Sequence, residues 1–274
     1  MIRQRDDFMQ KQTLHSIQKL KTTKEPITVL TVYDSSFSKL VSELGVEIML
    51  VGDSLGMVMQ GHHTTVPVTM ENMIYHTLCV ANGNKGSWLI SDLPYMSYSS
   101  KKQTFTNAAL LMQAGANMVK LEGGEWICSS IKKLVKRGIP VCGHLGLTPQ
   151  SVDALGGYKV QGREKSDAEK IINDSIAIEK AGAQMLVLEC VPYELAKEIT
   201  QQLSIPTIGI GAGNQTDGQV LVLQDMLGLN SDFRPKFAKN FFEGEAVSSV
   251  SDAINAYITE VKNRSFPAEQ HSFK

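Results

Sequence analysis

Short apolar runs recur along this chain, and five of them end on a residue that can bind a metal ion or move a proton. These runs lead into Asp53, Asp92, Glu122, His144 and Glu189. Short, mostly apolar runs are typical of buried strands. The carboxyl ends of parallel strands meet at one end of an α/β barrel, so the pattern predicts that these five side chains share one mouth.

Helical patterns precede three of these runs. Apolar residues at helical spacing predict three helices, each followed by a glycine: 35–44 with Gly45, 104–113 with Gly115, and 166–180 with Gly182. Residues 114–118 and 181–185 also share the pattern Ala-Gly-Ala-(Asn/Gln)-Met. Helix, glycine and short strand in repeated order predict βα units and a parallel sheet.

The strand pattern also gives a fold class. Eight strands are expected, at 27–32, 46–52, 87–91, 117–121, 139–143, 184–188, 206–210 and 219–223. Eight strands in 274 residues favour one α/β domain over 1–274, a (β/α)₈ TIM barrel. A doubly wound open sheet is the alternative, but no GxGxxG fingerprint follows an early strand. Residues 1–24 are expected to form a helical or irregular extension. Residues 247–274 are expected to form a helix (247–261) and a tail that covers the barrel or reaches a neighbouring subunit.

Composition narrows the class of ligand. The chain carries 27 Lys and Arg against 28 Asp and Glu, a net charge of −1, so nothing favours nucleic acid or an anionic membrane as a partner. No apolar run approaches the roughly 20 residues that span a bilayer, and no signal-peptide pattern is present. The four cysteines lack zinc spacing. We therefore expect a cytoplasmic protein with a small-molecule ligand.

Three of the polar strand ends come from neighbouring strands. Asp53, Asp92 and Glu122 end the second, third and fourth apolar runs of the predicted barrel. Three carboxylates in a low-dielectric cleft repel one another unless a cation neutralises them. Donors that are all oxygen favour a hard ion, so we predict an Mg²⁺ site. The alternative is that Asp53 and Asp92 cap the helices that follow them.

Three further residues supply candidate acid–base chemistry. Lys120 is two residues before Glu122 and faces the same side of its strand, where an ammonium needs carboxylates or a ligand's oxygens. Glu189 ends the sixth strand, across the barrel from the proposed metal, and is the candidate general base. His144 lies between them and is predicted to donate to a substrate oxygen or to orient a neighbour. Its alternative is a structural histidine bonded to a loop.

Together these groups favour one kind of reaction. A divalent cation held by carboxylates can chelate the carboxylate and keto oxygens of a 2-oxo acid, which acidifies the adjacent C–H and stabilises an enolate. Lys120 adds positive charge near the keto oxygen, and Glu189 is placed to remove the proton. The residues predict proton abstraction next to a carbonyl, followed by carbon–carbon bond making or breaking.

Five longer motifs resemble those of the ketopantoate hydroxymethyltransferase family. They are VGDSLGM at 51–57, KLEGG at 120–124, GHLGLTPQ at 143–150, GGYKVQGR at 156–163 and IGIGAG at 208–213. The resemblance runs from about residue 27 to residue 273 and implies a (β/α)₈ barrel. It also implies transfer of a hydroxymethyl group from 5,10-methylenetetrahydrofolate to 3-methyl-2-oxobutanoate, which gives 2-dehydropantoate on the route to pantothenate and coenzyme A.

The resemblance also implies a role for each matching residue. It assigns magnesium to three carboxylates, Asp53, Asp92 and Glu122. It assigns contacts with the oxo acid to four side chains, Asp53, Ser54, Asp92 and Lys120. Glu189 matches the family's proton acceptor. Family members assemble as large homo-oligomers, typically decamers, so a homo-oligomer is expected here, with the C-terminal segment as a contributor.

Two other functions remain open at this point. One is a magnesium-dependent 2-oxo-acid lyase or mutase of the isocitrate lyase and phosphoenolpyruvate mutase type, whose mobile cysteine-bearing loop motif is absent from this sequence. The other is a catalytically silent barrel that binds a metabolite. Such a barrel is expected to have lost the base or a metal ligand, yet all four carboxylates are present.

Overall fold

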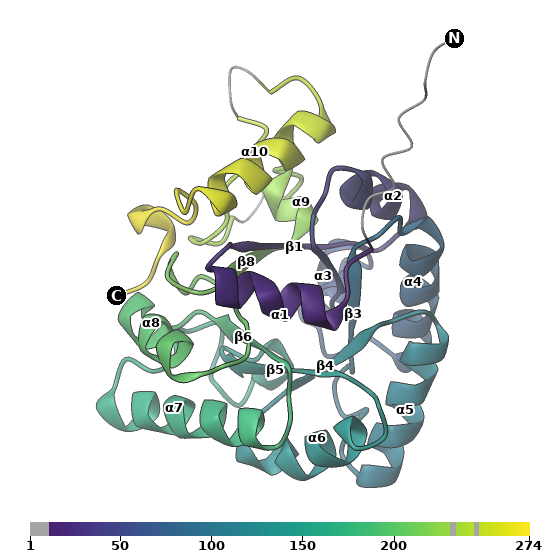
Figure 1. The fold of residues 1–274 in the computed structure, drawn as a ribbon, viewed down its shortest axis with the longest axis vertical. Coiled ribbons are helices and arrows are strands. Elements are labelled where there is room, and N and C mark those ends of the chain that lie inside the picture. Colours follow the sequence, from purple (N-terminus) through teal and green to yellow (C-terminus); the bar gives the residue numbers. More distant parts are fainter. Residues whose placement is uncertain (1–10, 231–233, 244–246) are drawn as a thin grey trace.

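Eight parallel strands close into a barrel that is surrounded by helices (Figure 1). The computed structural model describes residues 11–230, 234–243 and 247–274. The strands pair in chain order and are β1 Ile27–Thr31, β2 Ile48–Val51, β3 Trp88–Asp92, β4 Met118–Glu122, β5 Val141–Gly146, β6 Met185–Glu189, β7 Thr207–Ile210 and β8 Gly218–Leu221. Because β8 also pairs with β1, the sheet has no edge. The predicted (β/α)₈ barrel is confirmed, and the open sheet is excluded.

Helices follow most of the strands. They are α1 Leu14–Thr23, α2 Ser35–Glu43, α3 Leu55–Val58, α4 Met70–Gly83, α5 Lys101–Gln113, α6 Cys128–Val135, α7 Lys165–Lys180, α8 Tyr193–Gln202, α9 Leu223–Met226 and α10 Val250–Lys262, with 3₁₀ turns η1 Glu125–Ile127, η2 Pro149–Ser151 and η3 Glu269–His271. The three helices predicted before strands are α2, α5 and α7. The helix α5 begins three residues earlier than predicted because Ser100 caps it, accepting a hydrogen bond from the Gln103 N–H. No described helix is both long and apolar enough to cross a membrane.

Two strand boundaries differ from the prediction in ways that affect the site. β5 was expected to end at Gly143, but it continues to Gly146 because Leu145 and Gly146 still pair with β6. His144 therefore lies within a strand and is held by the barrel. β8 ends at Leu221, two residues early, because Leu223 already begins the short helix α9.

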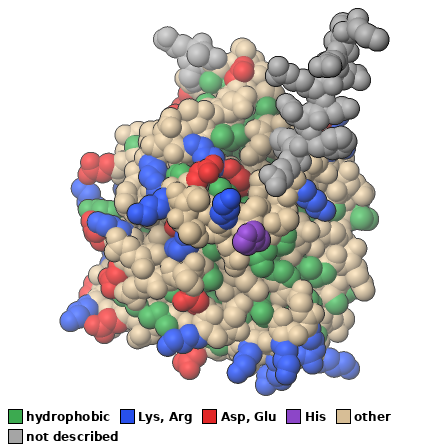
Figure 2. All heavy atoms as spheres, viewed as in Figure 1, with side chains coloured by type: hydrophobic (Ala, Val, Ile, Leu, Met, Phe, Trp, Pro, Cys, Tyr) green, Lys and Arg blue, Asp and Glu red, His purple; other side chains and the backbone are tan. Residues whose placement is uncertain are grey.

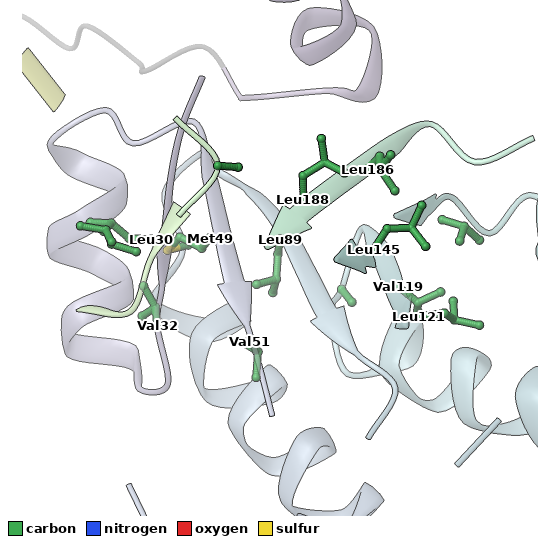
Figure 3. Close-up of a cluster of buried hydrophobic side chains, with 14 of the residues drawn as sticks. Leu30, Val32, Met49, Val51, Leu89, Val119, Leu121, Leu145, Leu186 and Leu188 are labelled. Carbon is green, nitrogen blue, oxygen red and sulfur yellow. The ribbon is translucent and has the colours of Figure 1, made fainter. Parts of the chain in front are cut away.

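The two faces of each strand meet different surroundings. Side chains that face outward pack against the helices, and Figure 3 labels ten members of this cluster: Leu30, Val32, Met49, Val51, Leu89, Val119, Leu121, Leu145, Leu186 and Leu188. Side chains that face inward form a second apolar cluster, which includes Val29, Ile48, Ile90, Met118 and Met185. Since side chains alternate along a strand, this register also turns Lys120 and Glu122 into the barrel with Met118.

The helix α1 closes the N-terminal end of the barrel, where it lies across the strands in Figure 1. Ile17 of α1 is fully buried in the inward-facing cluster. Lys21 ties the helix to the barrel through its Nζ, which is 2.7 Å from Asp217 Oδ2 and 3.0 Å from the Thr200 carbonyl oxygen. The described part of the predicted N-terminal extension is therefore a helical plug, and residues 1–10 lie outside the described residues.

Figure 2 shows the same face in space-filling form. Lys and Arg side chains gather along its lower edge, near the position of α6 in Figure 1. The last residues of α6 and the turn after it carry Lys132, Lys133, Lys136 and Arg137. Cations at the C-terminus of a helix complement its dipole, which gives this cluster a structural explanation.

The C-terminal segment covers the side of the barrel. Its helix α10 begins three residues later than predicted because Ser249 caps it by accepting the Asp252 N–H. Tyr257 is buried, and its hydroxyl lies 2.9 Å from the Val29 carbonyl oxygen and 2.8 Å from that of Gln219. These bonds anchor α10 across the seam between β1 and β8.

Candidate active site

The polar strand ends do meet at one mouth of the barrel. Register places Asp92 beside Lys120, Glu122 beside His144, and Gly146 beside Glu189 on neighbouring strands. Along each of these strands the inward-facing residues change from apolar to polar toward the carboxyl end. The barrel therefore holds a dry layer below and a charged layer above it.

Lys120 is the centre of the charged layer. Its Nζ is 3.0 Å from Asp92 Oδ2 and 3.7 Å from Glu122 Oε1, and the side chain is almost fully buried. Burial lowers the pKa of an ammonium, but the charges of Asp92, Glu122 and Asp53 outweigh this effect and raise the pKa of Lys120 above its usual value. Lys120 therefore stays protonated inside the barrel.

His144 connects two carboxylates that the sequence could only place on nearby strands. Its Nδ1 is 3.2 Å from Glu122 Oε1 and 3.3 Å from Lys120 Nζ, and its Nε2 is 3.3 Å from Glu189 Oε2. Neither carboxylate contact has hydrogen-bond alignment. Burial and Lys120 lower the pKa of His144, but the two carboxylates outweigh them and raise it to about 9. The alternative of a histidine bonded to a loop is wrong.

Asp53 lies one residue beyond Gly52 at the top of β2. Its backbone N–H donates to Asp92 Oδ2 over 3.1 Å, which joins the second and third strands of the site. Burial, followed by the charges of Asp92 and Glu122, raises the pKa of Asp53 well above its usual value. The pKa of Asp92 is also raised, chiefly by burial. The positive charge near Asp53 and Asp92 is therefore too small to offset the burial and mutual repulsion of the two carboxylates.

Gln150 is a site residue to which sequence reasoning gave no role. Its Nε2 donates to Asp53 Oδ2 over 2.7 Å, and its backbone N–H donates to Glu122 Oε2 over 3.1 Å. Its Oε1 accepts the Tyr98 hydroxyl hydrogen over 2.7 Å. Gln150 in η2 thus holds the carboxylate that follows β2 and the one that ends β4. Its presence in the motif at 143–150 was the available signal.

Ser54 lies beside a second residue that the sequence did not single out. The hydroxyl oxygens of Ser54 and Tyr33 are 2.8 Å apart. Burial raises the pKa of Tyr33, so the phenol stays neutral and can donate. This pair extends the polar surface of the mouth toward β1.

The capping alternative for the two aspartates is excluded. Ser54 is the residue before α3 and Ser100 the residue before α5, so neither Asp53 nor Asp92 occupies an N-cap. Both carboxylates are buried and face the other polar strand ends instead.

Buried carboxylate oxygens without a hydrogen bond indicate where a cation fits. Asp92 Oδ1 and Glu122 Oε1 both accept no hydrogen bond, although Lys120 Nζ and His144 Nδ1 lie within 3.7 Å of Glu122 Oε1. A buried carboxylate oxygen can only accept, so a hard cation is the partner that its chemistry suits. Among the described residues, however, no three His, Cys, Asp or Glu side chains already form a closed metal-binding group. The donor chemistry fits a divalent cation, and Lys120 supplies part of the positive charge.

The two sides of the mouth carry different groups. Asp53, Asp92 and Glu122 form an anionic side around Lys120, whereas Glu189 is the most exposed of the five strand-end residues, with 15% of its side chain accessible. His144 stands between the two sides.

Comparisons with known proteins show which family this chain resembles. The sequence model of ketopantoate hydroxymethyltransferase matches residues 11–269. The 3-methyl-2-oxobutanoate hydroxymethyltransferase of Idiomarina loihiensis is 56% identical over 264 residues, which cover 96% of this chain and 98% of that protein. The protein of the same name from Pseudomonas fluorescens is 56% identical over 262 residues, covering 95% and 98%.

Solved structures of much lower identity share the fold. A phosphonopyruvate hydrolase complex with oxalate and Mg²⁺ has a TM-score of 0.61 at 13% identity and covers 95% of this chain and 99% of that one. An oxaloacetate acetylhydrolase has a TM-score of 0.60 at 14% identity, covering 92% and 93%. The family assignment rests on the sequence matches, which span nearly the whole chain: this protein belongs to the ketopantoate hydroxymethyltransferase family.

Proposed function

We propose that this protein transfers a hydroxymethyl group from 5,10-methylenetetrahydrofolate to 3-methyl-2-oxobutanoate and forms 2-dehydropantoate. The observation that carries the proposal is that relatives 56% identical over at least 95% of the chain are named for hydroxymethyl transfer to that oxo acid. The site supports it, because a base and an anionic cation-binding side face each other across one mouth.

Glu189 is the proton acceptor in this proposal. Its carboxylate is reachable from the mouth, and its Oε2 lies 3.3 Å from His144 Nε2, close enough for the ring to orient the carboxylate. The C3 hydrogen of the oxo acid lies next to its keto group, so removal of that proton gives an enolate. Proton transfer by a positioned side chain contributes roughly 10²–10⁴-fold to a rate.

The other residues hold the oxo acid. Asp53, Asp92 and Glu122 would hold Mg²⁺, which supplies positive charge to the carboxylate and keto oxygens when bound and so acidifies C3–H. Lys120 donates toward the keto oxygen, where negative charge develops. Ser54, oriented by the Tyr33 hydroxyl, donates to the oxo acid's carboxylate.

Atoms and protons balance in the proposed transfer. The C3–H bond breaks and its proton passes to Glu189, while C3 bonds to the methylene carbon of the folate. Both carbon–nitrogen bonds of that methylene carbon break, and water supplies the hydroxyl group. The C3 proton and one water proton end on the two folate nitrogens, and tetrahydrofolate leaves.

A product assay on the native protein tests the proposal against its alternatives. With Mg²⁺, 3-methyl-2-oxobutanoate and 5,10-methylenetetrahydrofolate, mass spectrometry should detect 2-dehydropantoate only when the folate is present. Cleavage of 2-oxo acids without folate would instead identify a lyase. Binding of the oxo acid without any turnover would identify a silent barrel.

The metal assignment has its own test. Asp53→Ala should lose both Mg²⁺ activation and affinity for the oxo acid, whereas Glu198→Ala, an exposed acid on α8, should lose neither. Unchanged Mg²⁺ activation in Asp53→Ala would contradict the assignment. A homo-oligomer and a cytoplasmic location stay predictions, and light scattering after gel filtration checks the first.

A further inference from the structure

A cavity of about 530 Å³ lies beside the mouth and opens to the surface. Glu122 and Gln150 line it, so it shares a wall with the proposed oxo-acid site. Gly146 also lines it, and this residue pairs with Glu189 on the neighbouring strand. The cavity therefore borders the anionic side and the strand pair that carries the base, and its volume is typical of small-molecule sites.

Trp126 forms one wall of this cavity. Its side chain is 63% exposed, yet its ring stacks on Tyr98 with centroids 5.8 Å apart and planes 12° from parallel. Gly123 has a φ of 133°, and a Cβ there would come within 2.5 Å of the indole nitrogen. The backbone after β4 thus leaves room for an exposed indole that lines the same cavity as Glu122.

Two further lining residues are also large, apolar and exposed. Tyr95 is 45% and Met96 56% exposed, and Met96 has a φ of 58°, a conformation that is unfavourable for a residue with a side chain. Three large apolar side chains are thus exposed to solvent around one cavity. Exposed apolar patches of this kind often mark a ligand-binding surface. Strained backbone is concentrated at such sites.

The charges of the cavity select among ligands. Three carboxylates line it, from Glu122, Asp167 and Asp174, against the single ammonium of Lys170. Lys170 is already bonded to Asp174 over 2.9 Å. The walls therefore disfavour an anionic group and suit a flat heteroaromatic ring whose N–H groups donate.

We propose that this cavity binds the pterin ring of the one-carbon donor, stacked on Trp126, with the transferable carbon directed past Gln150 toward the oxo acid. This inference rests on the proposed function, because it assigns the second substrate of that reaction. It places the two substrates on the two sides of the wall formed by Glu122 and Gln150.

The test compares two reactions of the same protein. Exchange of the C3 proton of 3-methyl-2-oxobutanoate needs no folate, whereas hydroxymethyl transfer needs both substrates. Trp126→Ala should raise the KM for 5,10-methylenetetrahydrofolate roughly 10-fold, as expected for loss of one aromatic stacking partner, and leave the exchange rate within twofold of wild type. Tyr75→Ala, an equally exposed aromatic on α4, is the matched control and should change neither.

Fluorescence gives a direct binding readout. The chain has two tryptophans, Trp88 and Trp126. Tetrahydrofolate should quench the emission of Trp126, and Trp126→Phe should lose this quenching while it keeps the KM within threefold, because phenylalanine still stacks. An unchanged folate KM in Trp126→Ala, or quenching that persists in Trp126→Phe, would overturn the assignment. Absence of exchange in the wild type would instead overturn the proposed function.

Discussion

The two ends of the barrel interior are built from the same strands but differ in almost every physical respect. At the N-terminal end, Ile17 of α1 packs into a dry cluster with Ile48 and Met118. At the other end, two inward-facing positions beyond Met118 on the same strand, Glu122 lies among buried charges whose pKa values are shifted. The same strand contributes to both layers. Burial of apolar side chains at the N-terminal end therefore offsets the unfavourable burial of charge at the other end.

The comparison predicts that equivalent substitutions have different consequences at the two ends. Substitutions in the apolar layer should lower stability and leave the chemistry of folded molecules intact. Substitutions in the charged layer should change the chemistry, and they change stability to the extent that they leave a buried charge alone.

The largest difference should appear when one lysine is removed from each end. Lys120→Met leaves Asp92 and Glu122 without their buried cation, so the free energy of unfolding without divalent metal should fall by about 3–5 kcal/mol. Lys21→Met removes a partly exposed ion pair with Asp217 and should cost about 1–2 kcal/mol. Urea unfolding measures both. Equal losses in the two variants would contradict the difference between the ends.

A cavity at the closed end comes next in size. Ile17→Ala should lower the free energy of unfolding by about 3 kcal/mol, because a fully buried side chain leaves a void under the barrel. C3 proton exchange per folded molecule should stay at the wild-type rate. Lys19→Ala, on the exposed face of α1, is the control and should be neutral. A loss of exchange in a folded Ile17→Ala protein would show that the ends are not separate.

The support of the charged end can be weakened without removing a charge. Gln150→Leu abolishes the side-chain hydrogen bonds to Asp53 and Tyr98 and should cost about 2 kcal/mol. Because Asp53 then loses its orientation, the Mg²⁺ concentration for half-maximal exchange should rise roughly 10-fold. Gln113→Leu, exposed at the end of α5, is the control. Wild-type Mg²⁺ dependence in Gln150→Leu would remove Gln150 from this role.

The smallest effect should come from the outer seam. Tyr257→Phe removes the hydroxyl that bonds the Val29 and Gln219 carbonyl oxygens, and should cost about 1–2 kcal/mol. Exchange and Mg²⁺ dependence should not change, because the Tyr257 hydroxyl bonds β1 and β8, which do not carry the charged residues. A change in either quantity would show that the C-terminal helix influences the site.

Much of this architecture followed from sequence because it rests on local periodicity. The apolar runs fixed the strands, and alternation placed Lys120 on the same face as Glu122. The extension of β5 to Gly146 was not predictable, because it depends on pairing with β6 and the local sequence is rich in glycine. The same holds for the raised pKa of His144, which arises from carboxylates on two other strands.

Gln150 is a site residue whose role could not be predicted from the sequence. A neutral side chain after Pro149 carries no charge signal and no period, so only its place in the motif at 143–150 marked it, and that gave it no role. Its role depends on a loop that brings its amide to Asp53, which is far away in the chain. The plugging role of α1 was equally hidden, because it depends on the packing of Ile17 against distant strands and on the bonds of Lys21 to Thr200 and Asp217.

The central claim is that the charged end removes a proton from the oxo acid through Glu189. The direct measurement is exchange of the C3 proton of 3-methyl-2-oxobutanoate in deuterated water, followed by NMR with and without Mg²⁺ and without folate. Wild type and the exposed control Glu194→Gln should exchange in the presence of Mg²⁺, while Glu189→Gln should bind the oxo acid and exchange at least about 10²-fold more slowly. Wild-type exchange in Glu189→Gln would contradict the account.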